Sequence, residues 1–293
     1  MLNYNGFKET LIAQIKDYLP VKYKDFKVEM YKVEKINQSR EGMCLVDKNK
    51  SVSASPVIYV DTLYAHYVRY ESLAKTMRMA AEMITDAFAY TPNNYNIELS
   101  EDNIVLVLIN YEKNKKLLEK LPHVKYLDMA FVFRWLISAD DNGTTGGLIT
   151  NEMADKFGLN KDKLFELAKK NTRRILPPKI ESLGDMLKRL CREECFCEYE
   201  SFPLPVYVLS NERAFEGAAN IVYTDILDQL KTRLNDDIYI IPSSINELLI
   251  VPKSFAEPKV VRNMVKEVNV MAVSEEEQLS DNVYLYEGEV RMV

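Results

Sequence analysis

The stretch 203–252, PLPVYVLSNERAFEGAANIVYTDILDQLKTRLNDDIYIIPSSINELLIVP, decides the fold of this chain. Its short apolar runs PVYVL (205–209), IYII (238–241) and LLIV (248–251) are bounded by turn residues, which is typical of strands. Between the first two runs, apolar residues recur with helical spacing from about 218 to 234. The pattern predicts an α+β fold with a mixed, mainly antiparallel sheet and helices packed on one of its faces.

The N-terminal third carries its own set of elements. Apolar spacing predicts a helix over 4–19, a strand over 26–36 and a helical segment over 60–90 with a break near Tyr70 and Glu71. The sequence TPNNYN (91–96) consists of turn-forming residues, and it is the best candidate for a boundary. We therefore expect two parts, a smaller N-terminal α/β part over 1–95 and a main α+β domain over 96–293.

Composition limits the class of protein. The chain has 293 residues, of which 47% are hydrophobic and 28% charged, so it can bury a sizeable core. Its net charge of −6 argues against a broad nucleic-acid surface, which needs an excess of basic residues. A lysine cluster that would support such a surface is interrupted by Glu112 and Glu119; its members are Lys113, Lys115, Lys116 and Lys120. The sequence shows no signal peptide and no membrane-spanning run, so we expect a soluble, cytoplasmic protein.

Metal and imidazole chemistry have few residues to use. Only His66 and His123 are present, so a histidine-rich zinc site is excluded and any catalytic triad would need one of these two. Cys191, Cys195 and Cys197 have the spacing C-x3-C-x-C, which lacks a fourth ligand and the usual C-x2-C pair. A metal site there remains an alternative to unpaired thiols. We expect no metal and no cofactor.

Two common catalytic loops are missing from the sequence. No G-x-S-x-G pattern marks a hydrolase nucleophile. The segment DDNGTTGG (140–147) is rich in glycine, but it lacks the G-x4-G-K-[ST] pattern of a phosphate loop. We interpret it as a hairpin turn.

The sharpest polar cluster lies in the turn PSSINE (242–247). Its hydroxyl, amide and carboxylate groups could face a ligand together with polar residues from the turn that follows 205–209. The candidate ligand-binding residues are Asn211, Arg213, Ser243, Ser244, Asn246 and Glu247. The alternative is structural, because serine and asparagine side chains in turns often bond to their own backbone. The two interpretations differ in geometry, since a binding site requires these side chains to converge on one cleft.

Several segments resemble an uncharacterised domain-of-unknown-function family that is common in Clostridia-type Firmicutes. The most specific are VYVLSNERAFEGAANIVY (206–223) and DIYIIPSSINELLIVP (237–252). Similar segments elsewhere extend the resemblance over nearly the whole chain; they are 54–68, 108–133 and 166–178. The chain departs from the family pattern at Asn246, where the family usually has histidine, and this puts imidazole chemistry at this turn in doubt. The resemblance implies no known reaction, cofactor or partner.

Two functions remain open at this stage. The first is a non-enzymatic protein that binds an unknown protein or small-molecule partner, without a membrane or nucleic acid. The second is an enzyme that acts on a small anionic or amide substrate through a polar pocket at the turns 211–213 and 242–247. We favour the first, because no catalytic set of residues emerges from the sequence.

Overall fold

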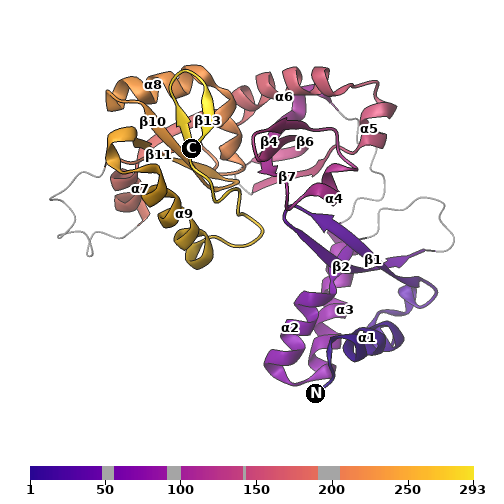
Figure 1. Cartoon of the computed structure of the whole chain (residues 1–293). Helices are drawn as coiled ribbons and strands as arrows, with labels where there is room; N and C mark the ends of the chain where they lie inside the picture. The colour runs from indigo at the N-terminus through magenta and orange to yellow at the C-terminus, as the bar shows by residue number, and fades with distance from the viewer. Residues whose placement is uncertain (48–55, 91–99, 141–142, 191–204) are drawn as a thin grey trace. The chain divides into compact units, whose positions relative to one another are not determined.

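The structure is a computed structural model, and it divides into two compact units (Figure 1). The residues that it describes are 1–47, 56–90, 100–140, 143–190 and 205–293. The first unit comprises residues 1–35 and 39–98, and the second comprises residues 36–38 and 99–293.

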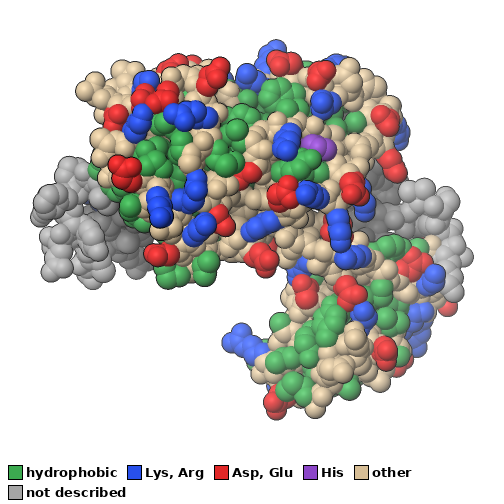
Figure 2. Space-filling model, viewed as in Figure 1, with side chains coloured by type: hydrophobic (Ala, Val, Ile, Leu, Met, Phe, Trp, Pro, Cys, Tyr) green, Lys and Arg blue, Asp and Glu red, His purple; other side chains and the backbone are tan. Residues whose placement is uncertain are grey.

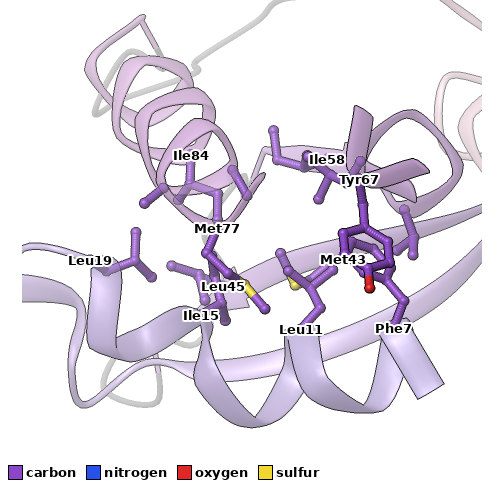
Figure 3. Close-up of a cluster of buried hydrophobic side chains, with 14 of the residues drawn as sticks. Phe7, Leu11, Ile15, Leu19, Met43, Leu45, Ile58, Tyr67, Met77 and Ile84 are labelled. Carbon is purple, nitrogen blue, oxygen red and sulfur yellow. The ribbon is translucent and has the colours of Figure 1, made fainter. Parts of the chain in front are cut away.

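The first unit combines a three-stranded sheet with three helices. Its elements are α1 (Tyr4–Tyr18), η1 (Val21–Tyr23), β1 (Lys27–Lys35), β2 (Gln38–Val46), β3 (Val57–Tyr59), α2 (Val60–Tyr70) and α3 (Leu73–Tyr90). The predicted break between the last two helices is confirmed, because Glu71 ends α2 with a left-handed backbone at φ 49°. One face of α1 is fully buried through Phe7, Leu11 and Ile15, at the i, i+4 spacing of a helix (Figure 3).

The strands of the second unit form two sheets, where the sequence predicted one. The six-stranded sheet has the order β13-β12-β10-β11-β9-β8, and the four-stranded sheet has the order β4-β6-β5 with β7 paired to β6. The strands are β4 (Ile104–Asn110), β5 (Val124–Tyr126), β6 (Met129–Asp140), β7 (Gly143–Leu148), β8 (Pro178–Ser182), β9 (Tyr207–Asn211), β10 (Ile238–Ser244), β11 (Glu247–Pro252), β12 (Tyr284–Tyr286) and β13 (Val290–Met292). Neighbouring strands in both sheets run antiparallel, so the predicted α+β class is confirmed.

Helices pack on both faces of the six-stranded sheet, not on one as predicted. The helices of this unit are α4 (Lys115–Leu118), α5 (Asn151–Lys156), α6 (Lys161–Ile175), α7 (Leu183–Leu190), α8 (Thr224–Leu234) and α9 (Pro258–Ala272), with short 3-10 turns η2 (Glu101–Asn103), η4 (Gly217–Val222) and η5 (Lys253–Phe255). Leu285 on β12 shares a core cluster with residues of α9. Its neighbour Tyr286 reaches the other helix, with its hydroxyl 2.7 Å from Asp228 Oδ1 on α8. Since side chains alternate along a strand, α8 and α9 lie on opposite faces.

An asparagine network holds three distant segments of the second unit together. The Asn37 N–H donates to Asn114 Oδ1 at 2.7 Å, and Asn114 Nδ2 donates back to Asn37 Oδ1 at 2.8 Å. Asn37 Nδ2 also donates to the carbonyl oxygen of Gln278 at 2.6 Å. Both asparagines are buried, so each bond satisfies a polar group that has left water.

No helix in the described part of the chain is long and apolar enough to cross a bilayer.

Candidate functional site

The turn that follows β9 is organised by Asn211. This residue is 3% exposed, and its Oδ1 accepts hydrogen bonds from the backbone N–H of Arg213 at 3.0 Å and of Phe215 at 3.3 Å. Its Nδ2 donates to the Phe215 carbonyl oxygen at 2.7 Å. Asparagine side chains commonly stabilise turns in this way, by hydrogen bonds to backbone groups of the same turn. Arg213 lies in the same turn with an exposed side chain.

The turn between β10 and β11 is organised by Asn246. Its Oδ1 accepts the backbone N–H of Glu216 at 3.0 Å, and its Nδ2 donates to Glu277 Oε1 at 3.0 Å. Its own N–H donates to Ser244 Oγ at 3.1 Å. The amide therefore joins the 242–247 turn to two other segments of the second unit, and Ser244 closes the turn itself.

The two turns meet along a line of short backbone contacts. The carbonyl oxygen of Asn246 accepts both the Ser210 hydroxyl at 2.6 Å and the Gly217 N–H at 3.1 Å. A Cβ built on Gly217 would lie 2.5 Å from the Asn246 carbonyl oxygen and 2.8 Å from Ser210 Cα. Only glycine leaves room for this approach, because real Cβ atoms do not come so near to other heavy atoms.

The structure therefore brings the two predicted turns together, but it uses three of the six candidate side chains for the turns themselves. Asn211, Ser244 and Asn246 all bond to backbone groups or to a neighbouring carboxylate. The side chain of Ser243 lies outside the described residues. The site assignment remains a prediction, and the geometry gives these three side chains a structural task.

Glu247 differs from its neighbours. Its carboxylate is partly buried, and no hydrogen bond or ion pair joins it to another residue in the part of the chain that the structure describes. Burial and the nearby charge of Glu277 raise the pKa of the Glu247 carboxyl above its ordinary value. Of the six candidates, it is the one with a perturbed acid group.

The sequence reasoning missed a buried ion pair beside these turns. The side chain of Glu216 is 2% exposed, and its Oε1 lies 2.6 Å from Nη2 of Arg134 on β6. Arg134 Nε lies 2.9 Å from each of the two carboxylate oxygens, so both oxygens are engaged. Burial raises the pKa of the Glu216 carboxyl, and the Arg134 charge opposes part of this rise. Nothing in the local sequence marks the pair, because the two residues are 82 positions apart.

Two cavities flank helix α8, and none of the six candidate residues lines either of them. The first has a volume of about 380 Å³; its lining is Glu166, Lys169, Lys170, Arg173, Val222, Tyr223, Thr224 and Asp225. The second has a volume of about 540 Å³; its lining is Ile180, Asp225, Asp228, Gln229, Leu230, Thr232 and Arg233. Both volumes are in the range of ordinary ligand sites, which is roughly 300–1,000 Å³.

The remaining sequence candidates have plain structural settings. His66 Nδ1 lies 2.8 Å from Thr76 Oγ1, and His123 Nδ1 lies 3.0 Å from the Leu121 carbonyl oxygen. Cys44 is buried with a free thiol. The C-x3-C-x-C segment lies outside the described residues. Within those residues, no group of three histidine, cysteine or acidic side chains is placed to hold a metal ion.

A family comparison agrees with this whole-chain architecture. Residues 4–288 match the model of a family described as Family of unknown function (DUF5688). The chain belongs to this family. Comparisons with curated proteins and with solved structures give no match. The resemblance to a family of unknown function is thus confirmed over nearly the whole chain, and the DUF5688 description assigns no reaction or ligand.

Proposed function

We propose that this member of the DUF5688 family is a non-enzymatic binding protein that adds an extended polypeptide segment to the edge of its six-stranded sheet at β8. The observation that carries the proposal is that β8 ends the order of the six-stranded sheet in the described part of the chain, next to the 540 Å³ cavity. Added strands of this kind gain affinity from main-chain hydrogen bonds and specificity from side-chain pockets.

The register of β8 shows which of its backbone groups face outward. The Leu183 N–H bonds to the Val206 carbonyl oxygen at 2.9 Å, and the Glu212 N–H bonds to the Pro177 carbonyl oxygen at 3.4 Å. Hydrogen-bonded pairs alternate along an antiparallel ladder, so the odd-numbered residues of β8 bond to β9. Ile180 therefore directs its N–H and C=O away from β9. Among the described residues, β9 is the only strand that pairs with β8.

The side chain of Ile180 supports the same site. It lines the cavity together with Leu230 of α8, so the cavity lies at the junction of the edge strand and the helix. A peptide strand beside β8 would direct alternate side chains into this space. The apolar surface suits an aliphatic stem, and the carboxylate of Asp228 suits a basic end group, whereas the Asp225 carboxylate is already paired with Arg173 at 2.6 Å. Arg233 lies in the same lining, and its guanidinium is 5.4 Å from the centre of the Tyr207 ring. We therefore propose an extended segment with a long basic side chain.

The substitution Ile180→Pro tests the backbone part of this proposal. Proline removes the outward N–H only, since the ladder to β9 uses odd-numbered residues, and proline is tolerated on edge strands in this orientation. Ile180→Val is the matched control, because it keeps both the N–H and a branched apolar side chain. The probe is a randomised ten-residue peptide library displayed against the immobilised full chain, with selected peptides then resynthesised for titration.

The expected result is a set of peptides with Lys or Arg at one fixed position. Ile180→Pro should weaken their binding by about tenfold or more, the equivalent of one lost hydrogen bond of about 1.4 kcal/mol. Ile180→Val should change it by less than about threefold. Asp228→Asn should weaken only the peptides that carry the basic residue. Equal binding by Ile180→Pro and wild type, or no selected peptides, would refute the proposal.

A further inference from the structure

The first cavity beside α8, of about 380 Å³, has an excess of basic side chains in its lining. Its charged residues are three basic and two acidic ones: Lys169, Lys170, Arg173, Glu166 and Asp225. The Arg173 guanidinium lies 2.6 Å from the Asp225 carboxylate, so this pair is neutral. The two lysines and the glutamate leave the lining with one net positive charge. Figure 2 shows basic and acidic side chains interspersed over α6, the helix that carries four of these five residues.

The two lysine amines have no partner of their own. Neither Lys169 nor Lys170 forms a side-chain hydrogen bond or an ion pair with another residue in the described ranges. Lys169 is partly buried, and a charge that is partly removed from water is stabilised by a partner of opposite charge. Glu166 is exposed, so water and salt screen its charge more strongly. The Tyr223 hydroxyl donates to the Lys169 carbonyl oxygen at 2.6 Å and holds α6 against the start of α8, so the cavity is preformed for an anion.

The two cavities follow one another along α8 and β8. Asp225, in the first turn of α8, lines both of them. The second cavity extends to Arg233, which lies over the ring of Tyr207, opposite Ser182 at the end of β8. The first cavity lies beside the last turns of α6, the helix that leads into the start of β8. A chain that follows β8 from its end toward its start therefore passes the second cavity and then reaches the first.

We propose that the segment bound at β8 also carries an acidic residue, Asp or Glu, whose carboxylate enters the first cavity and binds Lys169 and Lys170. This inference rests on the proposed peptide site. Neighbouring strands of the six-stranded sheet all run antiparallel, and antiparallel pairing is slightly the more stable. We therefore expect the segment to run antiparallel to β8, which places the acidic residue C-terminal to the basic one.

The structure also sets the spacing of the two charged residues in the segment. Asp228, in the second cavity, and Thr224, in the first, are four residues apart on α8, which is about 6 Å along the helix axis. Two residues of an extended strand cover roughly the same distance, about 6.6 Å. Alternate side chains of a strand also face the same way. We therefore expect the acidic residue two positions after the basic residue.

Peptides selected from the randomised ten-residue library against the immobilised full chain are the probe. For a selected peptide with this charge pattern, the double variant Lys169→Gln with Lys170→Gln should weaken binding by about threefold to tenfold. The same peptide with glutamine in place of its acidic residue should bind the wild type and the double variant within about twofold of each other, because the interaction is then already absent. The matched control is Lys161→Gln, which removes an exposed lysine of α6 outside the cavity lining and should leave binding unchanged.

The outcomes separate this inference from the proposed function. Selected peptides with a fixed basic residue but no acidic residue after it would overturn the carboxylate site and leave the β8 site standing. An equal loss of affinity for the acidic and the glutamine peptide in the double variant would do the same. A selection without peptides, or binding that Ile180→Pro does not weaken, would refute the β8 site and this inference with it. The fluorescence of Trp135, the single tryptophan, checks that the second unit is folded in every variant.

Discussion

Gly217 offers the sharpest test of how the two polar turns are held together. The substitution Gly217→Ala adds a Cβ that would lie 2.5 Å from the Asn246 carbonyl oxygen and 2.8 Å from Ser210 Cα, and also against Ser210 Oγ. Two of these three contacts are made with backbone atoms or a Cα, which cannot rotate away as a flexible side chain does. One of the two turns must therefore move.

The expected cost follows from the contacts that this movement breaks. Overpacking in a close-packed region costs about 1–3 kcal/mol. The Asn246 carbonyl oxygen also loses its short bonds to the Gly217 N–H and the Ser210 hydroxyl, and each such bond contributes about 0.5–1.5 kcal/mol. Since a shift of the turn lengthens these bonds without removing them fully, we expect a loss of about 2–4 kcal/mol in the free energy of unfolding.

The assay must report on the second unit alone, because a chain with two compact units need not unfold in one step. Trp135 is the single tryptophan, and it is buried on β6 of this unit. Urea unfolding followed by its fluorescence gives the stability of the second unit. The matched control is Gly147→Ala on β7, where an added Cβ meets no atom within 4 Å and the change should stay within about 0.5 kcal/mol.

A second variant separates the contacts. Ser210→Ala in the Gly217→Ala background removes the hydroxyl but leaves the two other contacts, so it should recover less than half of the lost stability. The reasoning fails if Gly217→Ala unfolds within about 0.5 kcal/mol of wild type, because the turns would then accommodate a methyl group without a cost.

Two further predictions concern buried charge. Arg134→Leu leaves the Glu216 carboxyl buried without its partner, which should lower the free energy of unfolding by about 3–5 kcal/mol at pH 8. Urea unfolding at pH 5 should show a smaller loss, because protonation removes the buried charge. A loss that does not depend on pH would contradict this reasoning. The pKa of the Glu247 carboxyl is raised in the folded state above its ordinary value of 4.5. The protonated carboxyl therefore stabilises the folded state at a pH below 4.5, and this contribution disappears as the pH rises through the folded-state pKa. Glu247→Gln should therefore melt at a higher temperature than wild type at pH 8 and at nearly the same temperature at pH 4; equal melting at both would show that neither burial nor Glu277 acts on this group.

Elements that bury a continuous apolar face could be predicted from the sequence. The run IVLVLIN forms β4 as a strand buried along nearly all of its length, and IYII forms the first part of β10. Residues 258–269 carry apolar residues at helical spacing and form most of α9, with Pro258 at its first turn. In these segments the local sequence pattern and the tertiary environment favour the same structure. The spacing of apolar residues is therefore sufficient to predict the helix or strand.

Elements that depend on distant partners were missed or predicted wrongly. The strand β8 is short and partly buried at all five positions, and its extended form comes from pairing with β9, so no local pattern shows it. The segment GTTGG, predicted as part of a turn, lies within strand β7, which pairs with β6. Gly146 fits there because a Cβ would lie against the backbone of Trp135. Residues 217–222 form a 3-10 turn and not the start of an α-helix.

The position of the polar turns could be predicted, but their partners could not. The pattern of serine and asparagine indicated turns that bond to their own backbone, and Asn211 does this. Asn246 also bonds to Glu216 and Glu277, which are 30 and 31 residues away. Such contacts depend on how the strands assemble into the sheet, and this assembly cannot be predicted from the local pattern of a single sequence.

The polar turns and the proposed peptide site are connected through β9. Asn211 lies directly opposite Pro178 in the β8–β9 ladder, and the Glu212 N–H of the same turn bonds to Pro177. The bonds from Asn246 fix the 211–217 turn on its other side, so the turn cannot move without moving the start of β8. A cluster that looks like a binding pocket in sequence would thus serve the proposed binding indirectly, because it fixes the strand to which we propose that a partner adds.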